Sequence, residues 1–203
     1  MIKAIIFDFA GVIATDTYWI WLRKKVPDLD KELSFFKDLS DQNDLGEISD
    51  EELFIQLEKV TKIKRNKIWQ EFRQELVINY DLINVIKLLK QKFKIGLLSN
   101  YNHNLLESIL TSNKLIDLFD KLIISSRHRI IKPDKKIFLI ALKKLKVKAE
   151  EAIFVDDRQV NVSAAEKLGI ESILFTSTNK LFQDLKKVTI ADLSHLRGVN
   201  VDN

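Results

Sequence analysis

Near its amino terminus the chain reads Ala4-Ile5-Ile6-Phe7-Asp8-Phe9-Ala10-Gly11-Val12. In this stretch Ala4, Ile5, Ile6 and Phe7 are apolar, and Asp8 and Gly11 follow them closely. A short apolar run with such an ending is typical of a buried strand in a parallel sheet. Similar runs recur at residues 94–98, 122–124, 152–155 and 172–175. We therefore predict a parallel sheet in which residues 4–7 form the first strand.

Amphipathic segments separate most of these runs, and helical periodicity is present at residues 81–91, 104–112, 134–145 and 160–168, the last before Gly169. Strands that alternate with helices predict right-handed crossovers and an α/β fold, a Rossmann-like parallel sheet flanked by helices. Residues 15–80 are the exception, because they show helical periodicity and no convincing strand. We expect them to form an inserted helical cap, with residues 1–14 and 81–203 as the core.

Composition excludes several classes of function. The chain of 203 residues contains no Cys, which removes disulfide frameworks, zinc-cysteine sites and thiol nucleophiles. No apolar run reaches the length of a membrane span, and Met1 leads into the first strand without the pattern of a signal peptide, so we expect a cytoplasmic protein. The formal charge of +4 comes from Lys residues scattered beside acidic residues, which indicates a solvated surface. We expect neither nucleic acid nor membrane as a partner.

Polar residues follow the predicted strands where a ligand site is expected. In an open parallel sheet, ligands bind beyond the carboxyl ends of the strands. Each of these residues could simply form a turn, because Asp and Ser are common there. Their coincidence at equivalent positions of the fold indicates a site. The candidates are Asp8 after the first strand, Ser99 and Asn100 after the second, Lys132 after the third, and Asp156 and Asp157 after the fourth.

The acidic candidates suit a metal ion. Mg²⁺ prefers oxygen ligands and is usually bound through one or two carboxylates. Asp8 with Asp156 or Asp157 could supply them. Such an ion would neutralise charge between Asp8 and an anionic substrate, so we predict Mg²⁺ as the cofactor.

The remaining candidates suit a phosphoryl group. Ser99 and the backbone amides near Asn100 can donate hydrogen bonds to phosphoryl oxygens, and Lys132 can bring a mobile positive charge. Together with a carboxylate nucleophile, these are the parts needed to bind and transfer a phosphoryl group. Gly11 lets the backbone turn tightly beside the reacting centre.

The order and spacing of these segments resemble the haloacid dehalogenase superfamily of phosphotransferases and hydrolases, over nearly the whole chain. The resemblance implies that Asp8 attacks phosphorus, that water hydrolyses the resulting aspartyl-phosphate, and that Mg²⁺ is held by Asp8, the Ala10 carbonyl and Asp156. Gly46-Glu47-Ile48-Ser49 is similar to a cap segment of sugar-phosphate phosphatases and epoxide-hydrolase amino-terminal domains. The matching segments are Asp8-Phe9-Ala10-Gly11-Val12, Leu98-Ser99-Asn100, Lys132-Pro133-Asp134 and Phe154-Val155-Asp156-Asp157.

Ala10 departs from the family pattern. Most family phosphatases carry a second Asp there, which protonates the leaving group and later activates water. Losing a general acid and base typically costs about 10²–10⁴-fold in rate. We therefore expect a hydrolase of a small phosphorylated metabolite that is slow or is tuned to good leaving groups.

Ala10 is also compatible with alternative interpretations. The residue could be engineered, or the protein could bind phosphorylated ligands without turnover. Haloacid dehalogenases carry an aromatic residue at this position, and phosphonoacetaldehyde hydrolases carry Ala. Lys132-Pro133 and the pair Asp156-Asp157 are more similar to phosphatases.

Overall fold

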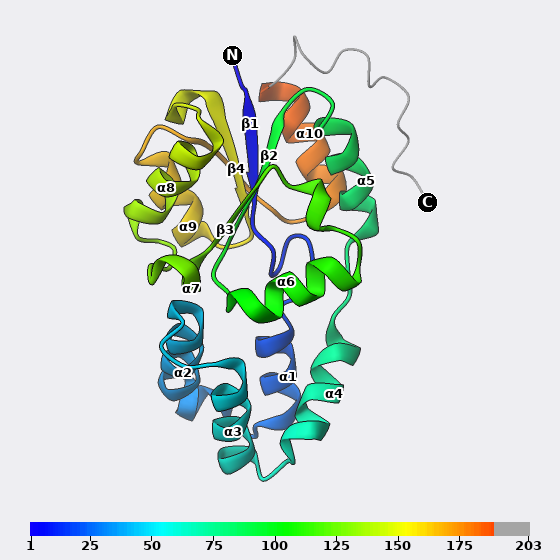
Figure 1. The fold of residues 1–203 in the computed structure, drawn as a ribbon, viewed down its shortest axis with the longest axis vertical. Helices are drawn as coiled ribbons and strands as arrows, with labels where there is room; N and C mark the ends of the chain where they lie inside the picture. Colours follow the sequence, from blue (N-terminus) through cyan, green and yellow to red (C-terminus); the bar gives the residue numbers. More distant parts are fainter. Residues whose placement is uncertain (189–203) are drawn as a thin grey trace.

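The computed structural model describes residues 1–188, so the part of the predicted core from 189 to 203 lies outside the described residues. Five parallel strands form one sheet in the order β3-β2-β1-β4-β5 (Figure 1). All five predicted strands are confirmed, with ends that differ by at most one residue. They are β1 (Ala4–Phe7), β2 (Lys94–Ser99), β3 (Lys121–Ile124), β4 (Ala152–Asp156) and β5 (Glu171–Leu174).

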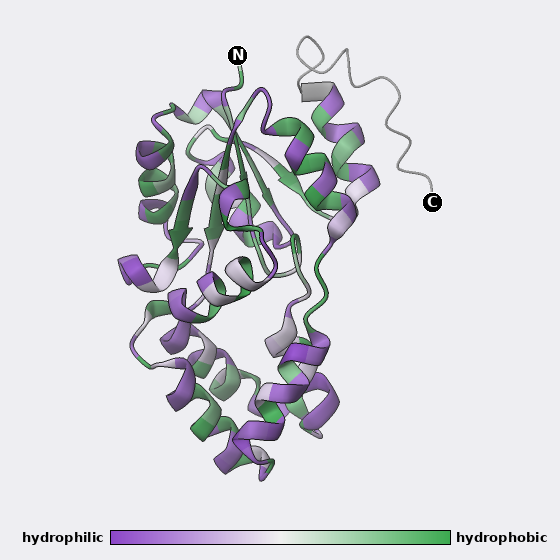
Figure 2. Cartoon of the chain, turned by 45° about the vertical axis from the view of Figure 1, so that its right-hand side comes forward, coloured by the Kyte–Doolittle hydropathy of each residue, from purple (hydrophilic) through white to green (hydrophobic). Residues whose placement is uncertain are grey.

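Both faces of the sheet are buried, which explains the unbroken apolar runs. Ile5 and Phe7 of β1 join one hydrophobic core, and Ala4 and Ile6 join the other. This division follows from the strand geometry, because successive side chains point to opposite faces. Figure 2 shows the strands as largely hydrophobic, whereas the helices carry hydrophilic residues as well. The parallel pairing brings the carboxyl ends of β1, β2 and β4 to one edge of the sheet.

Helices cover the two faces of the sheet, as Figure 1 shows. Those on one face are α5 (Tyr80–Leu89), α6 (His103–Ser112) and α10 (Thr178–Val188), and those on the other are α8 (Lys135–Leu145) and α9 (Gln159–Glu166). Four of them were predicted, and α10 and the four-residue α7 (Ser125–His128) were not. Gly169 follows α9 with a φ of +80°, the left-handed conformation that glycine favours. None of the helices within residues 1–188 is both long enough and apolar enough to cross a bilayer.

An inserted helical cap lies beyond the carboxyl edge of the sheet (Figure 1). Its helices enclose a third hydrophobic core that includes Trp21, Phe36, Leu57 and Ile68. A separate core allows the cap to hold its own shape. The elements are α1 (Thr17–Lys25), η1 (Leu29–Glu32), α2 (Leu33–Leu45), α3 (Asp50–Thr61) and α4 (Arg65–Glu75).

The two linkers to the cap run side by side. Ala14 forms an antiparallel bridge with Ile78, and the Thr15 N–H donates to the Val77 carbonyl at 3.1 Å. The Val77 N–H donates in return to Thr15 Oγ1 at 3.0 Å. The chain therefore leaves and re-enters the core at one place, close to the expected boundaries at residues 14 and 81.

A second connection joins the cap to the core at the turn between α2 and α3. Gly46 ends α2 with a φ of +72°, and Ser49 begins α3 by accepting a hydrogen bond from the Glu52 N–H. A Cβ atom on Gly46 would lie 3.1 Å from the Cβ of Ser126 in α7. The turn at residues 46–49 is thus pressed against the core beside the carboxyl edge of the sheet.

Candidate active site

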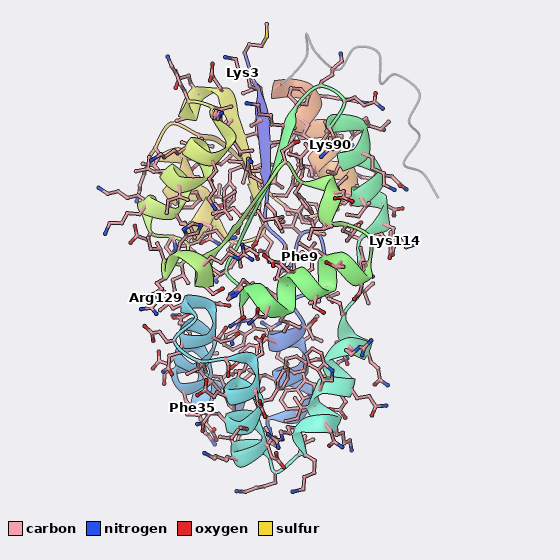
Figure 3. All side chains as sticks on the ribbon, viewed as in Figure 1. Lys3, Phe9, Phe35, Lys90, Lys114 and Arg129 are labelled. Atoms are coloured by element: carbon pink, nitrogen blue, oxygen red, sulfur yellow. The ribbon has the colours of Figure 1, made fainter. Side chains whose placement is uncertain are left out.

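Four of the predicted segments meet at the carboxyl edge of the sheet. Asp8 directly follows β1, Ser99 ends β2 and Asp156 ends β4, while Lys132 lies in the loop between α7 and α8. All four side chains are buried. Figure 3 places Phe9, the neighbour of Asp8, at the centre of the molecule between the sheet and the cap.

Lys132 joins two of the acidic residues. Its Nζ lies 2.8 Å from Asp8 Oδ1 and 2.7 Å from Asp156 Oδ2, and only 1% of its side chain is exposed. Asn100 holds the main chain of Lys132, because Asn100 Oδ1 accepts from the Lys132 N–H at 2.7 Å and Nδ2 donates to the Lys132 carbonyl at 3.1 Å. Because the side chain of Asn100 is engaged in this way, only its backbone N–H is available to donate to a phosphoryl group. The buried Lys132 ammonium needs the carboxylates of Asp8 and Asp156 as partners, since an unpaired buried charge is costly.

Asp156 is surrounded by donors. Asn161 Nδ2 donates to both carboxylate oxygens, at 3.0 and 3.1 Å, and the Arg158 N–H donates to Oδ1 at 2.9 Å. Burial raises the pKa of Asp156, but Lys132 and these hydrogen bonds outweigh it, so the pKa is lowered from its usual value. Asp156 is therefore ionised near neutral pH.

The pKa of Asp8 shifts in the opposite direction to that of Asp156. Burial raises the pKa of Asp8 to about 7, although the charge of Lys132 opposes the shift. The Phe9 N–H donates to Asp8 Oδ1 at 2.7 Å. A cation beside this carboxylate favours its charged form, which is the form that acts as a nucleophile.

The acidic residues fit a divalent cation. Oxygen atoms from Asp8, Asp156 and Asp157 lie within 4.8 Å of one another. An all-oxygen set of this kind suits Mg²⁺. Gly11 allows the Asp157 carboxylate to approach the backbone, because a Cβ atom on Gly11 would lie 2.2 Å from Asp157 Oδ2. Within residues 1–188 the Ala10 carbonyl accepts no hydrogen bond, so its oxygen is available as a further ligand.

Ser99 carries an unsatisfied hydroxyl. The residue is fully buried, and its Oγ has no hydrogen-bond partner within the described part of the chain. Buried polar groups without partners are rare in folded proteins and call for an explanation, such as a ligand. A phosphoryl oxygen would satisfy this hydroxyl, although its role as a phosphate ligand stays a prediction.

Comparison with known families agrees with this arrangement. The family of haloacid dehalogenase-like hydrolases matches residues 2–169, which is most of the chain. The chain belongs to the haloacid dehalogenase-like hydrolases. The resemblance expected from the four motif segments is confirmed.

Curated relatives of this hydrolase have several activities. It is 31% identical over 130 residues to bifunctional epoxide hydrolase 2 of Sus scrofa, and the match covers 60% of this chain but only 23% of that protein. The chain thus spans about a quarter of that relative. It is 28% identical over 189 residues to D-ribitol-5-phosphate phosphatase of Bacteroides thetaiotaomicron, with 85% of this chain and 91% of that protein covered.

The fold of the haloacid dehalogenase-like hydrolase also matches solved structures. One of them is a haloacid-dehalogenase-family enzyme of Bacteroides thetaiotaomicron, crystallised as the wild-type protein with magnesium and inorganic phosphate. The TM-score is 0.72 at 21% identity, and the match covers 90% of this chain and all of that one. This likeness establishes the same fold.

Sequence reasoning missed three residues of this hydrolase that lie where cap and core meet. Ser125 Oγ accepts from the Tyr101 N–H at 2.9 Å and donates to the Asp44 carbonyl at 2.5 Å. Asp16 begins α1 and lies within electrostatic reach of Arg158 and Asp157. The one available signal for Asp44 was its position two residues before the segment Gly46-Glu47-Ile48-Ser49.

Proposed function

We propose that this hydrolase is a Mg²⁺-dependent phosphatase of a small phosphorylated metabolite and that Asp8 is its nucleophile. The carrying observation is the buried ammonium of Lys132, which lies within 2.8 Å of both Asp8 and Asp156. A lysine held between two carboxylates keeps one of them ionised and offers a positive charge to an anionic substrate.

The reaction takes place in two steps on Asp8. In the first, an Asp8 carboxylate oxygen attacks phosphorus, the bond from phosphorus to the leaving oxygen breaks, and an aspartyl-phosphate forms. In the second, water attacks the same phosphorus and releases Asp8 and inorganic phosphate. Ser99 and Lys132 donate to the phosphoryl oxygens in both steps.

Three groups would hold the metal: the carboxylates of Asp8 and Asp156 and the carbonyl of Ala10, with Asp157 beside them. When bound, Mg²⁺ neutralises negative charge on the phosphoryl oxygens. The hydrogen bonds from Asn161 and Arg158 keep the Asp156 carboxylate in place. These residues would thus form a rigid, negatively charged binding site for a cation.

The cap accounts for the expected size of the substrate. Residues 15–80 form a second unit that covers the carboxyl edge of the sheet and is joined to the core by two paired linkers. Closing such a unit over the site excludes water and limits the room for the substrate. The relatives support this choice, since one is a sugar-alcohol-phosphate phosphatase and a similar structure holds magnesium and phosphate.

A phosphate-release screen tests the proposal. The purified chain is incubated with a panel of sugar, polyol and nucleoside monophosphates in Mg²⁺, and in parallel with EDTA. We expect phosphate release from at least one small substrate in Mg²⁺ and its loss in EDTA. Chloride release from a 2-haloacid without metal would instead assign the chain to the dehalogenases. Binding of phosphorylated ligands without any turnover would assign it to the non-enzymatic alternative.

A further inference from the structure

With Ala at position 10, the site has no general acid and base at the position that most family phosphatases use. An alkoxide leaves an alkyl phosphate poorly unless it receives a proton, and the water of the second step must lose one. The methyl group of Ala10 can do neither. A second carboxyl group near Asp8 and Lys132 could supply both functions.

Asp44 lies in the last turn of α2, at the place where the cap meets the core. Its carbonyl accepts a hydrogen bond of 2.5 Å from Ser125 Oγ. The same hydroxyl accepts from the backbone N–H of Tyr101, two residues after Ser99. Ser125 thus anchors Asp44 to the loop that follows β2, next to the buried Ser99. The close packing of Gly46 against Ser126 holds the end of α2 there.

The Asp44 residue is half-buried, and no other side chain of the described residues holds its carboxyl group. Within residues 1–188 it makes no hydrogen bond and no ion pair. Burial raises the pKa of Asp44 well above its usual value, and the charges of Asp41 and Asp16 add to the shift. Lys132 lowers it and Asp8 raises it. The carboxyl group is therefore within electrostatic reach of the catalytic pair, and its surroundings favour the protonated form.

Asp16 is the other acidic residue of the cap near the site, and it is less suited to the task. Burial raises the pKa of Asp16, but the Trp19 main chain and the guanidinium groups of Arg158 and Arg23 oppose the shift. The pKa of Asp16 is therefore raised less than that of Asp44, so its carboxyl group is the weaker candidate for a proton donor.

We propose that Asp44, carried by the cap, replaces the missing carboxylate at position 10 as the general acid and base. The proposal rests on the proposed phosphatase function. As Asp8 attacks phosphorus, the Asp44 proton passes to the leaving oxygen and the product departs as an alcohol. The Asp44 carboxylate then accepts a proton from the water that attacks the aspartyl-phosphate, and the carboxyl group is restored. Because Asp44 belongs to α2, proton transfer requires the cap to be docked on the core.

The variant Asp44→Asn separates this role from a structural one. On an alkyl phosphate, such as a polyol phosphate found in the screen, we expect kcat to fall by about 10²–10⁴-fold. On 4-nitrophenyl phosphate the leaving group needs no proton. The variant should therefore release the first equivalent of nitrophenolate nearly as fast as the parent and then turn over slowly, since water activation is impaired.

Two further variants complete the experiment. Asp38→Asn is the matched control, because Asp38 is an exposed acidic residue on the same helix, six residues before Asp44. It should change alkyl-phosphate turnover by less than about threefold. The double variant Asp44→Asn, Ala10→Asp should regain part of the lost turnover, because the carboxyl group is returned to the position that most family phosphatases use.

Three results would overturn the proposal. One is an alkyl-phosphate rate that is unchanged in Asp44→Asn. Another is an equal loss of the nitrophenolate burst and of alkyl-phosphate turnover, which indicates a damaged site. The third is an Asp38→Asn variant as impaired as Asp44→Asn. A parent protein that does not cleave even 4-nitrophenyl phosphate would instead refute the phosphatase function itself.

Discussion

Replacing Lys132 with Met should destabilise the folded protein strongly in the absence of metal. The substitution keeps most of the apolar stem and removes the ammonium group, with its charge and its hydrogen-bond donors. Asp8 and Asp156 then lose the cation that lies 2.8 and 2.7 Å from their oxygens, in a place where at most 7% of any of the three side chains is exposed. Two carboxylates are left facing each other out of water.

The size of the loss follows from this burial. Breaking a buried ion pair by removing one partner costs about 3–5 kcal/mol. In a domain of this length 1 kcal/mol shifts Tm by about 2–4 °C, so Lys132→Met should unfold roughly 6–20 °C below the parent.

Lys180 provides the matched control. Its Nζ lies 2.7 Å from Asp184 Oδ1, the same distance as in the buried pair, but the two side chains are 50% and 22% exposed. Exposed pairs contribute about 0–1 kcal/mol, so Lys180→Met should lower Tm by less than about 4 °C. The assay is thermal unfolding followed by circular dichroism in EDTA. If Lys132→Met and Lys180→Met unfold within about 2 °C of each other, the buried pair does not have the energetic role assigned to it.

Three shorter predictions follow from the same region. Asp156→Asn should weaken Mg²⁺ binding at least about tenfold by calorimetry, because a charged ligand is lost, and unchanged affinity would exclude Asp156 from the metal site. Gly11→Ala and Gly169→Ala should both cost about 1–2 kcal/mol at their positive φ. Only Gly11→Ala should also weaken Mg²⁺ binding, because its Cβ would lie 2.2 Å from Asp157 Oδ2. The nearest atom to a Cβ on Gly169 is 3.9 Å away. Equal Mg²⁺ affinities of the two glycine variants would contradict this prediction. Asp44→Asn should raise Tm at pH 8 by about 2–4 °C per kcal/mol of charge burial removed. Because the pKa of Asp44 is raised in the folded state, the parent protein loses stability as pH rises through that pKa. The Tm advantage of Asp44→Asn should therefore disappear toward pH 4, where the carboxyl group is protonated in the parent as well.

The fold was predictable because its signals are local. The runs that became β1, β2 and β4 are apolar on both faces, and this is visible in four to six consecutive residues. The same reasoning located Asp8, Ser99 and Asp156, because a residue that ends a parallel strand is placed at the ligand edge by topology alone.

The contacts between cap and core were not predictable in this way. Asp44 and Ser125 are 81 positions apart, and their hydrogen bond exists only because the end of α2 docks on α7. The backbone amides near Asn100 stay a predicted phosphoryl-binding element, whereas the hydrogen bonds of the Asn100 side chain to the main chain of Lys132 had no signal in the sequence. The short helix α7 has only four residues, too few for a helical period to be visible in the sequence.

The central claim, that Asp8 is the nucleophile of a phosphatase, is tested most directly by comparing the parent with Asp8→Asn on 4-nitrophenyl phosphate in Mg²⁺. An amide has nearly the shape of a carboxylate but is a poor nucleophile. Circular dichroism of both proteins verifies that the fold is retained. We predict that the parent releases nitrophenolate and phosphate and that Asp8→Asn shows neither a burst nor turnover above the uncatalysed rate. Turnover by a folded Asp8→Asn variant within about tenfold of the parent would contradict the account, since the phosphoryl group would then be transferred without Asp8.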